Sequence, residues 1–276
     1  MEILGIDVGG RGIKGAVVET TTGEFIEPRM RLRTPQPATP ESVAAMVAEL
    51  VAHFEWTGPV GVGFPAVVRD NVVRSAANID DSWIGVDAVR LFEEQAPCSF
   101  VVANDADAAG LAEMQFGAGR SHQGVALLLT IGTGIGSALF VDGRLLPNTE
   151  LGHLEIRGRK AEHIASGAVR QHKQLSWRKW SARLNVVLDT YEKLLAPDLI
   201  VIGGGVSKKS EKFLGMLRTE AKLVPASMRN LAGIVGAALI AADLQVHGDH
   251  EGREKRLSVW TRSEERRVGK ECATGC

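Results

Sequence analysis

The chain has 276 residues, a formal net charge of −1 and 45% hydrophobic residues, which allows one large domain or two modest ones with a real core. The balanced charge gives no support for nucleic-acid or membrane-surface binding, and no stretch approaches the ~18 consecutive apolar residues of a membrane span. The three cysteines, Cys98, Cys272 and Cys276, include no CxxC pair, so they predict neither a disulfide framework nor a zinc site and favour a reducing cytoplasm.

Strand and helix patterns alternate along the first half of the chain. The apolar run ILGIDVGG (3–10) ends in glycines and IKGAVVET (13–20) resumes the strand pattern, which predicts a hairpin with a glycine-rich turn. Thr39 and Pro40 are typical of an N-cap and a first helical residue, and they predict a helix as far as Phe54. Further strands are expected over 59–68 and 99–105, and further helices over 86–94 and 106–116, the last closed by Gly117.

The second half opens with another glycine hairpin, ALLLTIGTGIGSALFVDGRLL (126–146), and contains a buried strand, LIVIGGGVS (199–207). Helices are expected over 161–175, 177–195, 210–223 and 231–246. The segment from Asp7 to Ile13 lines up with Thr130 to Ile135, with one residue inserted. Both read as strand, glycine turn and strand, so the sequence suggests a duplicated α/β architecture with a cleft between its halves. Chance similarity of two glycine hairpins is the alternative.

Three glycine-rich turns each follow an apolar strand. Glycine allows the backbone N–H groups to approach an anion closely, so three such turns at strand ends indicate a phosphate site better than one would. None matches the GxxxxGK[ST] loop, and none has the full dinucleotide-binding context. The turns are Gly9-Gly10-Arg11-Gly12, Gly132-Thr133-Gly134-Ile135-Gly136 and Gly203-Gly204-Gly205.

Charged side chains stand beside the first turn. Asp7 ends the first strand, where a carboxylate can hold Mg²⁺, directly or through water, against phosphate oxygens. Lys14 lies across the hairpin and could neutralise a phosphate, although a solvated lysine is the ordinary interpretation of such a residue.

Two further pairs of polar residues can each be interpreted in two ways. Asn104-Asp105 lies where a strand passes into a helix, so Asp105 could be a catalytic base or an N-cap, and Asp107 fits the cap as well. Glu150 and His153, in ELGH, could point at one sugar ring or form a surface turn. The pattern alone does not choose between these roles.

The motifs DVGG, IKG, GFPAVV, AAN, NDADAAGLAE, TIGTGIG, ELGH and IGGGVS occur in an order that resembles the ROK family of sugar kinases and repressors. The resemblance runs from about Ile3 to about Asp243. It implies the actin-like/hexokinase (ribonuclease H-like) duplicated fold, with two domains around a cleft. The smaller domain is expected at 1–104 plus about 231–247, and the larger one at 105–230.

The resemblance also implies roles for individual residues. Asp105 becomes the catalytic base, and it shares glucose binding with Asn78, Asn104, Glu150, His153 and Glu162. Donor phosphates and Mg²⁺ are expected at the first turn, with Asp7 as the metal-side residue. The implied donor-binding set is Asp7, Gly9, Gly10, Lys14, Gly132, Thr133, Gly134, Gly136, Gly203, Gly204 and Gly205.

One departure from the family points to a branch of it. Most members carry a cysteine cluster before the Glu162 position that holds zinc with a histidine, whereas this chain reads EIRGRKAEH there. We therefore expect no zinc and expect His153 to serve the sugar. SAANIDDSWIG, LSWRKW and IGGGVSKK resemble the zinc-less polyphosphate glucokinases. That resemblance implies a cytoplasmic homodimer that phosphorylates glucose from inorganic polyphosphate, with ATP as a second donor.

Other functions compete with this one. The family includes sugar-responsive regulators, but only Met1 and Glu2 precede the first strand, which leaves no DNA-binding helix pair in this sequence. An inactive sugar-binding protein is disfavoured by Asp105 and the phosphate turns. An ATP-dependent kinase for another hexose stays open. Candidate cations for a polyphosphate chain are Arg11, Arg178, Lys179, Arg183, Lys208, Lys209 and Lys212.

The last stretch differs from the rest. From Gly248 on, the chain is charge-dense and its apolar periodicity stops, and RSEERRVGKEC (262–272) resembles the conceptual translation of a sequencing adapter. We expect 248–276 to be a disordered or artefactual tail without a function.

Overall fold

The computed structural model describes residues 1–248, and contacts group Met1–Ala242 into one compact unit, apart from the remainder of the chain. Residues 249–276, with the adapter-like segment, Cys272 and Cys276, lie outside the described residues, so the prediction of an artefactual tail is not tested. No helix among residues 1–248 has both the length and the apolar character needed to cross a bilayer.

The first sheet forms around the predicted N-terminal hairpin. Strand β1 (Glu2–Gly9) pairs antiparallel with β2 (Gly12–Glu19) and parallel with β5 (Val60–Phe64), and β8 (Phe100–Asn104) adds parallel to β5. Strands β3 (Glu24–Phe25) and β4 (Met30–Leu32) both pair with β2. The order is β3-β2-β1-β5-β8, so the carboxyl ends of β1, β5 and β8 meet at one edge.

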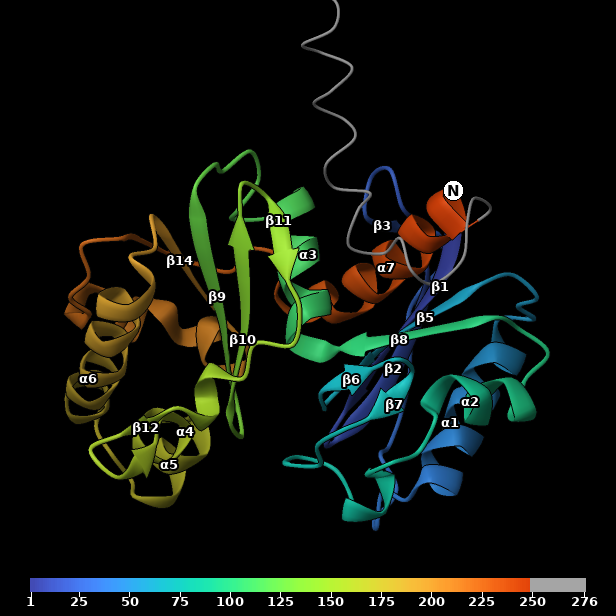
Figure 1. The fold of residues 1–276 in the computed structure, drawn as a ribbon, viewed down its shortest axis with the longest axis horizontal. Helices are drawn as coiled ribbons and strands as arrows, with labels where there is room; N and C mark the ends of the chain where they lie inside the picture. The colour runs from blue at the N-terminus through green and yellow to red at the C-terminus, as the bar shows by residue number, and fades with distance from the viewer. Residues whose placement is uncertain (249–276) are drawn as a thin grey trace, which may run out of the picture. The chain divides into compact units, whose positions relative to one another are not determined.

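The second sheet repeats this topology (Figure 1). Strands β9 (Val125–Ile131), β10 (Ile135–Val141) and β11 (Arg144–Leu146) form an antiparallel set, and β14 (Leu199–Gly203) and β15 (Lys222–Pro225) add in parallel. The order β11-β10-β9-β14-β15 matches that of the first sheet strand for strand. The duplication suggested by the two glycine hairpins is therefore confirmed.

Helices cover the outer faces of the two sheets. Helices α1 (Pro40–His53) and α2 (Ala88–Gln95) pack on the first sheet, and Thr39 caps α1 as predicted, because its side chain accepts a hydrogen bond from Ser42 N. Helices α4 (Ala161–Ala165), α5 (Gly167–His172) and α6 (Trp177–Leu195) lie beside the second sheet. Short elements complete the described fold: β6 (Val68–Arg69), β7 (Val72–Val73), β12 (Glu155–Ile156), β13 (Arg159–Lys160) and 3₁₀ turns at Asp81–Trp83, Leu151–His153, Gly205–Lys212, Leu214–Met216 and Arg229–Leu231.

Two helices lie between the sheets (Figure 1): α3 (Asp105–Phe116) and the described part of α7 (Ala232–Gly248). Small residues let their backbones approach one another and the sheets. A Cβ at Gly236 would meet the backbone of Ala108, and a Cβ at Gly61 would meet the backbone of Ala237. This close packing fixes the first turn of α3 at the edge where β1 and β8 end.

Two helix predictions were wrong in part. The segment predicted as a helix over 210–223 forms 3₁₀ turns and then strand β15. Gly215 interrupts it, and Phe213 is buried against Trp177 and Trp180 at a single point, without the repeated apolar face of a helix. The helix predicted over 161–175 breaks at Ser166, which is extended and caps α5 through Val169 N.

Candidate active site

The first turn of α3 shows that Asp105 is not the N-cap, which was one of the two roles that the sequence left open. The N-cap is Asn104, whose side-chain oxygen accepts hydrogen bonds from Ala106 N at 2.8 Å and Asp107 N at 3.2 Å. Asp105 is the first helical residue, so it is not the cap, and its carboxyl group stands at the carboxyl end of β8. The helix N-terminus favours negative charge at this position.

Burial and neighbouring carboxylates alter the acidity of Asp105. Its pKa is raised to about 7, first by desolvation and then by the negative charge of Asp7, with smaller contributions from Glu150 and Asp107 and an opposing hydrogen bond from Ala106. A carboxyl group with a pKa near neutrality can accept a proton and release it again at physiological pH.

Asp7 and Lys14 face each other across the first hairpin. Their strands pair Asp7 with Lys14 in register, and Lys14 Nζ lies 2.8 Å from Asp7 Oδ2. Both side chains are largely buried, at 17% and 26% exposure. Gly233, at the start of α7, packs on this carboxylate, because a Cβ there would lie 2.9 Å from Asp7 Cγ. No local pattern in the sequence indicates that Gly233 contacts Asp7, because the two residues are 226 positions apart.

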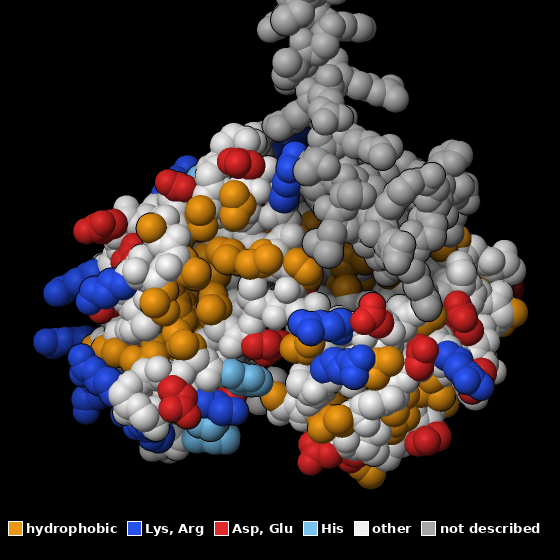
Figure 2. Space-filling model, viewed as in Figure 1, with side chains coloured by type: hydrophobic (Ala, Val, Ile, Leu, Met, Phe, Trp, Pro, Cys, Tyr) orange, Lys and Arg blue, Asp and Glu red, His pale blue; other side chains and the backbone are white. Residues whose placement is uncertain are grey.

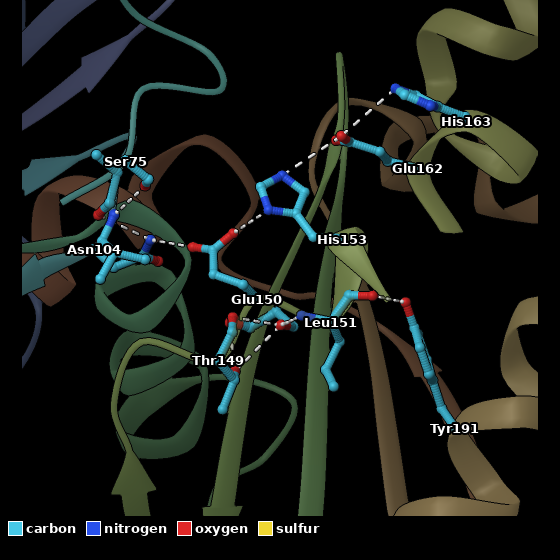
Figure 3. Close-up of polar contacts among 12 residues, drawn as sticks. Ser75, Asn104, Thr149, Glu150, Leu151, His153, Glu162, His163 and Tyr191 are labelled. Atoms are coloured by element: carbon cyan, nitrogen blue, oxygen red, sulfur yellow. Dashed lines mark hydrogen bonds and ion pairs between the residues drawn. The ribbon is translucent and has the colours of Figure 1, made fainter. Parts of the chain in front are cut away.

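Four of the predicted sugar-binding residues, Asn104, Glu150, His153 and Glu162, form one connected row (Figure 3). Asn104 Nδ2 donates to Glu150 Oε1 at 3.4 Å, and His153 places Nδ1 3.6 Å from Glu150 Oε2 and Nε2 3.5 Å from Glu162 Oε1. His163, which is mostly exposed, approaches Glu162 from outside at 3.8 Å. The pKa of Glu150 is raised, mainly by burial. The charge of His153 opposes this rise, and the negative charge of Glu162 adds to it. The row thus presents alternating acceptors and donors, as a ring of sugar hydroxyls requires.

The ELGH segment is held by contacts that the sequence reasoning missed. A Cβ at Gly152 would meet Ile135 O, so only glycine fits this turn against β10. Ser137 Oγ donates to Thr149 O and accepts from Leu151 N at 3.1 Å. Tyr191 Oη, on α6, donates to Leu151 O at 2.7 Å (Figure 3), and burial raises the pKa of this phenol. These contacts fix the positions of Glu150 and His153.

A second support comes from strand β6 and helix α3. Asn148, at positive φ, pairs its side chain with both Val68 N and Val68 O at 3.2 Å, and Asn148 N donates to Asp107 Oδ2 at 2.7 Å. Asp107 is buried, and its Oδ1 has no hydrogen-bond partner among the described residues. Its pKa is raised to about 7, and desolvation by burial is the largest cause. The sequence analysis assigned Asp107 only a capping role, whereas it holds the segment before Glu150.

Asn78 lies between the first and second glycine turns. A Cβ added at Gly10 would lie 4.0 Å from Asn78 O, and one at Gly134 would lie 3.5 Å from Asn78 Nδ2 and 2.6 Å from Glu162 Oε2. The AAN segment, the second turn and Glu162 are therefore neighbours. Glycine at 134 leaves the space in which the Glu162 carboxylate sits.

The second and third turns meet at the carboxyl ends of β9 and β14. Gly203 pairs with Thr130, and Gly204, at φ +74°, packs on the backbone of Ile131. The start of α5 closes on the second turn, since Ala168 N donates to Gly132 O at 3.1 Å. Thr133, at the tip of the turn, is exposed. Each predicted donor-binding glycine therefore lies in one of two groups: the β1–β2 turn, or the joined turns after β9 and β14.

The carboxylates near the first turn suit a magnesium ion that is bound mainly through a phosphate donor. No group of three or more His, Cys, Asp or Glu residues within 1–248 is arranged to hold a metal by itself. Mg²⁺ typically uses one or two carboxylates and keeps water and phosphate oxygens as its other ligands. Asp7, with Asp105 close enough to feel its charge, fits that donor set. The absence of zinc stays a prediction.

The ROK family profile matches residues 3–169. The chain belongs to the ROK family. It is 48% identical over 245 residues to the polyphosphate glucokinase of Mycobacterium tuberculosis strain CDC 1551, covering 88% of this chain and 92% of that protein. The polyphosphate glucokinase of Mycobacterium leprae is 48% identical over 237 residues, covering 86% of this chain and 73% of that protein.

Solved structures of ROK proteins share the fold. The inorganic polyphosphate/ATP-glucomannokinase of Arthrobacter sp. strain KM superposes with a TM-score of 0.85 at 48% identity, covering 88% of this chain and 99% of that one. A ROK family glucokinase from Streptomyces griseus, solved with glucose and AMPPNP, gives a TM-score of 0.77 at 24% identity, covering 88% of this chain and all of that one, and supports the fold alone. The predicted actin-like/hexokinase fold is confirmed.

Proposed function

We propose that this protein is a glucokinase that transfers a phosphoryl group from inorganic polyphosphate, and from ATP as a second donor, to the 6-hydroxyl of glucose. The observation that carries the proposal is the position of Asp105. Its carboxyl group has a pKa of about 7 and lies close enough to Asp7 and to Glu150 of the polar row for both charges to raise that pKa. The relatives named polyphosphate glucokinase, at 48% identity over most of the chain, supply the substrate pair.

In this proposal the sugar lies against the polar row. Asn104, Glu150, His153 and Glu162 offer oxygens and nitrogens that are already oriented by one another, and Asn78 completes the set beside Gly134. Pre-oriented partners lose little freedom when the ligand binds, which strengthens binding. On the face drawn in Figure 2, acidic and histidine side chains lie close together near the middle.

Asp105 acts as the general base. It accepts the proton of the glucose 6-hydroxyl while the oxygen attacks the terminal phosphorus in line, and the bond between that phosphorus and the bridging oxygen of the donor breaks. The donor leaves as a chain one phosphate shorter. Because the transition state is loose, positioning and charge stabilisation supply most of the acceleration.

The donor's terminal phosphates are expected between the first turn and the joined second and third turns. Backbone N–H groups of Gly9, Gly10 and Gly132 to Gly134 are suited to phosphate oxygens, and Lys14 supplies a positive charge. A bound Mg²⁺ would neutralise charge on these phosphates, with Asp7 as its protein-side ligand.

Three further statements remain proposals. We infer a smaller domain at 1–104 plus about 231–247 and a larger one at 105–230, since the two sheets fall on either side of this division. A homodimer and a cytoplasmic location follow from the resemblance to polyphosphate glucokinases. Mannose is a second acceptor to test, because the Arthrobacter relative at 48% identity is named a glucomannokinase.

The test uses the purified chain with glucose and Mg²⁺, and with long-chain polyphosphate or ATP as separate donors. We expect glucose 6-phosphate from polyphosphate at a higher kcat/KM than from ATP, and no product when EDTA removes the metal. A parallel assay with mannose in place of glucose shows whether the enzyme also accepts that hexose. Product from ATP alone would reject polyphosphate as a donor, and product from neither donor would reject the kinase.

A further inference from the structure

A row of charged side chains crosses three neighbouring strands of the first sheet. Asp7 on β1 pairs with Lys14 on β2, and Lys14 pairs with Arg31 on β4. Directly paired residues place their side chains on the same face of a sheet. Arg31 therefore stands next in line after the Asp7–Lys14 pair, on the side away from β5. The sequence could not show this, because β4 follows β2 through a connection without a clear pattern.

Arg31 is held against the glycine turn. Its guanidinium donates to Arg11 O at 3.2 Å and lies over Gly12, where a Cβ would come within 2.5 Å of Arg31 Nε. The chain after β4 is tied to the same turn, because the buried Thr34 hydroxyl donates to Gly9 O. The turn that is expected to contact the donor's terminal phosphates is thus continuous with the segment that carries Arg31 and Arg33.

An open hollow of about 720 Å³ lies at this place. Three arginines line it, no acidic residue does, and none of the three arginines forms an ion pair with any of residues 1–248. Three neighbouring positive charges without a counter-charge repel one another, so a bound polyanion would relieve that repulsion. The lining consists of Gly10, Arg11, Arg31, Leu32, Arg33, Thr34 and Gln36.

We propose that the hollow formed by Arg11, Arg31 and Arg33 binds the distal phosphates of a polyphosphate chain whose terminal phosphates lie at the glycine turns. The inference rests on the proposed function for the identity of the polyanion. Guanidinium groups suit this role, since their fork of N–H donors matches phosphate oxygens in pairs. The hollow begins at Gly10 of the first turn, so the inference assigns to Arg31 and Arg33 the phosphates that follow those held at the glycine turns, which a long donor has and a short one lacks.

Lys208 and Lys209, after the third turn, are also among the cations that the sequence offers for a polyphosphate chain, and they would define a different path. Both lysines are exposed on the 3₁₀ segment Gly205–Lys212. The row of charges that starts at Asp7 and Lys14 continues instead to Arg31 on β4, beside the hollow lined by arginines. The two paths make different predictions, which one set of variants separates.

The test compares Arg31→Gln/Arg33→Gln with Lys208→Gln/Lys209→Gln, which removes the same number of charges, and with Arg120→Gln, an exposed arginine in the turn after α3 that serves as a control for the loss of a surface charge. Binding of long-chain polyphosphate and of tripolyphosphate is measured by calorimetry without glucose, and KM is measured with each donor and with ATP. We expect the arginine pair to weaken long-chain binding by about tenfold or more, with less than about twofold change for tripolyphosphate, ATP and glucose. The slope of log Kd against log salt should fall by about one to two in the same variant.

Each outcome separates the inference from the proposed function. If the wild-type chain binds polyphosphate through these arginines but forms no glucose 6-phosphate, the hollow stands and the kinase assignment fails. If the enzyme turns over polyphosphate and the arginine pair leaves long-chain binding unchanged, the hollow is not the site. An equal loss for tripolyphosphate and long chains would also overturn it, because the effect would then lie at the glycine turns. A selective loss in the Lys208/Lys209 variant would assign the chain to the other path.

Discussion

The two glycine hairpins have the same strand order around them but carry different chemistry. In the first, the paired positions hold Asp7 and Lys14; in the second, the corresponding paired positions hold Thr130 and Gly136. The first hairpin therefore carries charged side chains at these positions, whereas the glycines of the second hairpin leave room for neighbouring side chains. Gly134 leaves room for Glu162, and Gly136 packs tightly against Thr130 and Ala106. The duplicated scaffold thus carries charged side chains on one hairpin, beside the expected donor phosphates and metal, and glycines on the other, where they adjoin Glu162 and the expected donor site.

Asp105 lies close enough to Asp7 of the first hairpin and to Glu150 of the sugar row for both charges to raise its pKa, so its loss should have the largest effect. Asp105→Asn should lower kcat by about 10³-fold, because general-base catalysis is removed while the shape of the side chain is kept. The substitution should not unfold the protein, since the cap of α3 is Asn104. Steady-state kinetics with either donor measure the effect.

Stability against pH provides the control for the same variant. The folded-state pKa of about 7 exceeds the unfolded value of 3.8, so Asp105 lowers the stability of the fold as pH rises from 3.8 to about 7, and the full loss is present above that range. Asp105→Asn, which cannot ionise, should raise the melting temperature at pH 8 and change it little at pH 4. A variant that melts early at both pH values and keeps its specific activity would show that Asp105 is structural.

Two glycines of the second hairpin test its role in the sugar site. A Cβ at Gly134 would lie 2.6 Å from Glu162 Oε2, whereas a Cβ at Gly132 would meet nothing within 4 Å. Neither glycine has positive φ, so alanine is compatible with both backbones. Gly134→Ala should displace the carboxylate and raise the glucose KM about tenfold, whereas Gly132→Ala should leave it within about twofold and change only the donor KM. Equal glucose KM values for the two variants would remove Glu162 from the sugar site.

The smallest effect is expected at the support behind the sugar row. Tyr191→Phe removes the hydrogen bond to Leu151 O and leaves a buried carbonyl without its partner, which should cost about 1–2 kcal/mol of stability. Glucose KM should rise about threefold, because the segment carrying Glu150 and His153 loses one anchor. Thr190→Val, which removes a hydroxyl bonded to Val186 O within the same helix, is the control. A glucose KM that changes equally in both variants would mean that Tyr191 acts only through helix α6.

Much of the scaffold was predictable, because its signals are local. The strands ending in glycine turns, the Thr39 cap and the repeat of the first hairpin all follow from residues close together in the chain. The wrong helix over 210–223 followed from apolar residues that serve one buried contact and an edge strand instead of a helical face. The amino-acid composition of residues 210–223 did not distinguish a helix from 3₁₀ turns followed by an edge strand.

Only those residues of the candidate site that belong to sequence motifs were predictable. Asp105 and the sugar residues were found through their resemblance to a family, and the pattern alone did not separate base from cap. Gly233, Tyr191 and Arg31 were missed, because each reaches the site through a contact between elements that are remote in sequence or that pair without a recognisable pattern.

The central claim, that Asp105 takes the proton of the glucose hydroxyl, is tested most directly by the pH dependence of kcat/KM for glucose with polyphosphate in excess. Because the base must be ionised and its pKa is raised to about 7, kcat/KM should fall about tenfold per pH unit below that value and level off above it. The residual activity of Asp105→Asn should lack this step. A wild-type profile that stays flat from about pH 5 to about pH 9, or an Asp105→Asn profile with the same step, would contradict the claim.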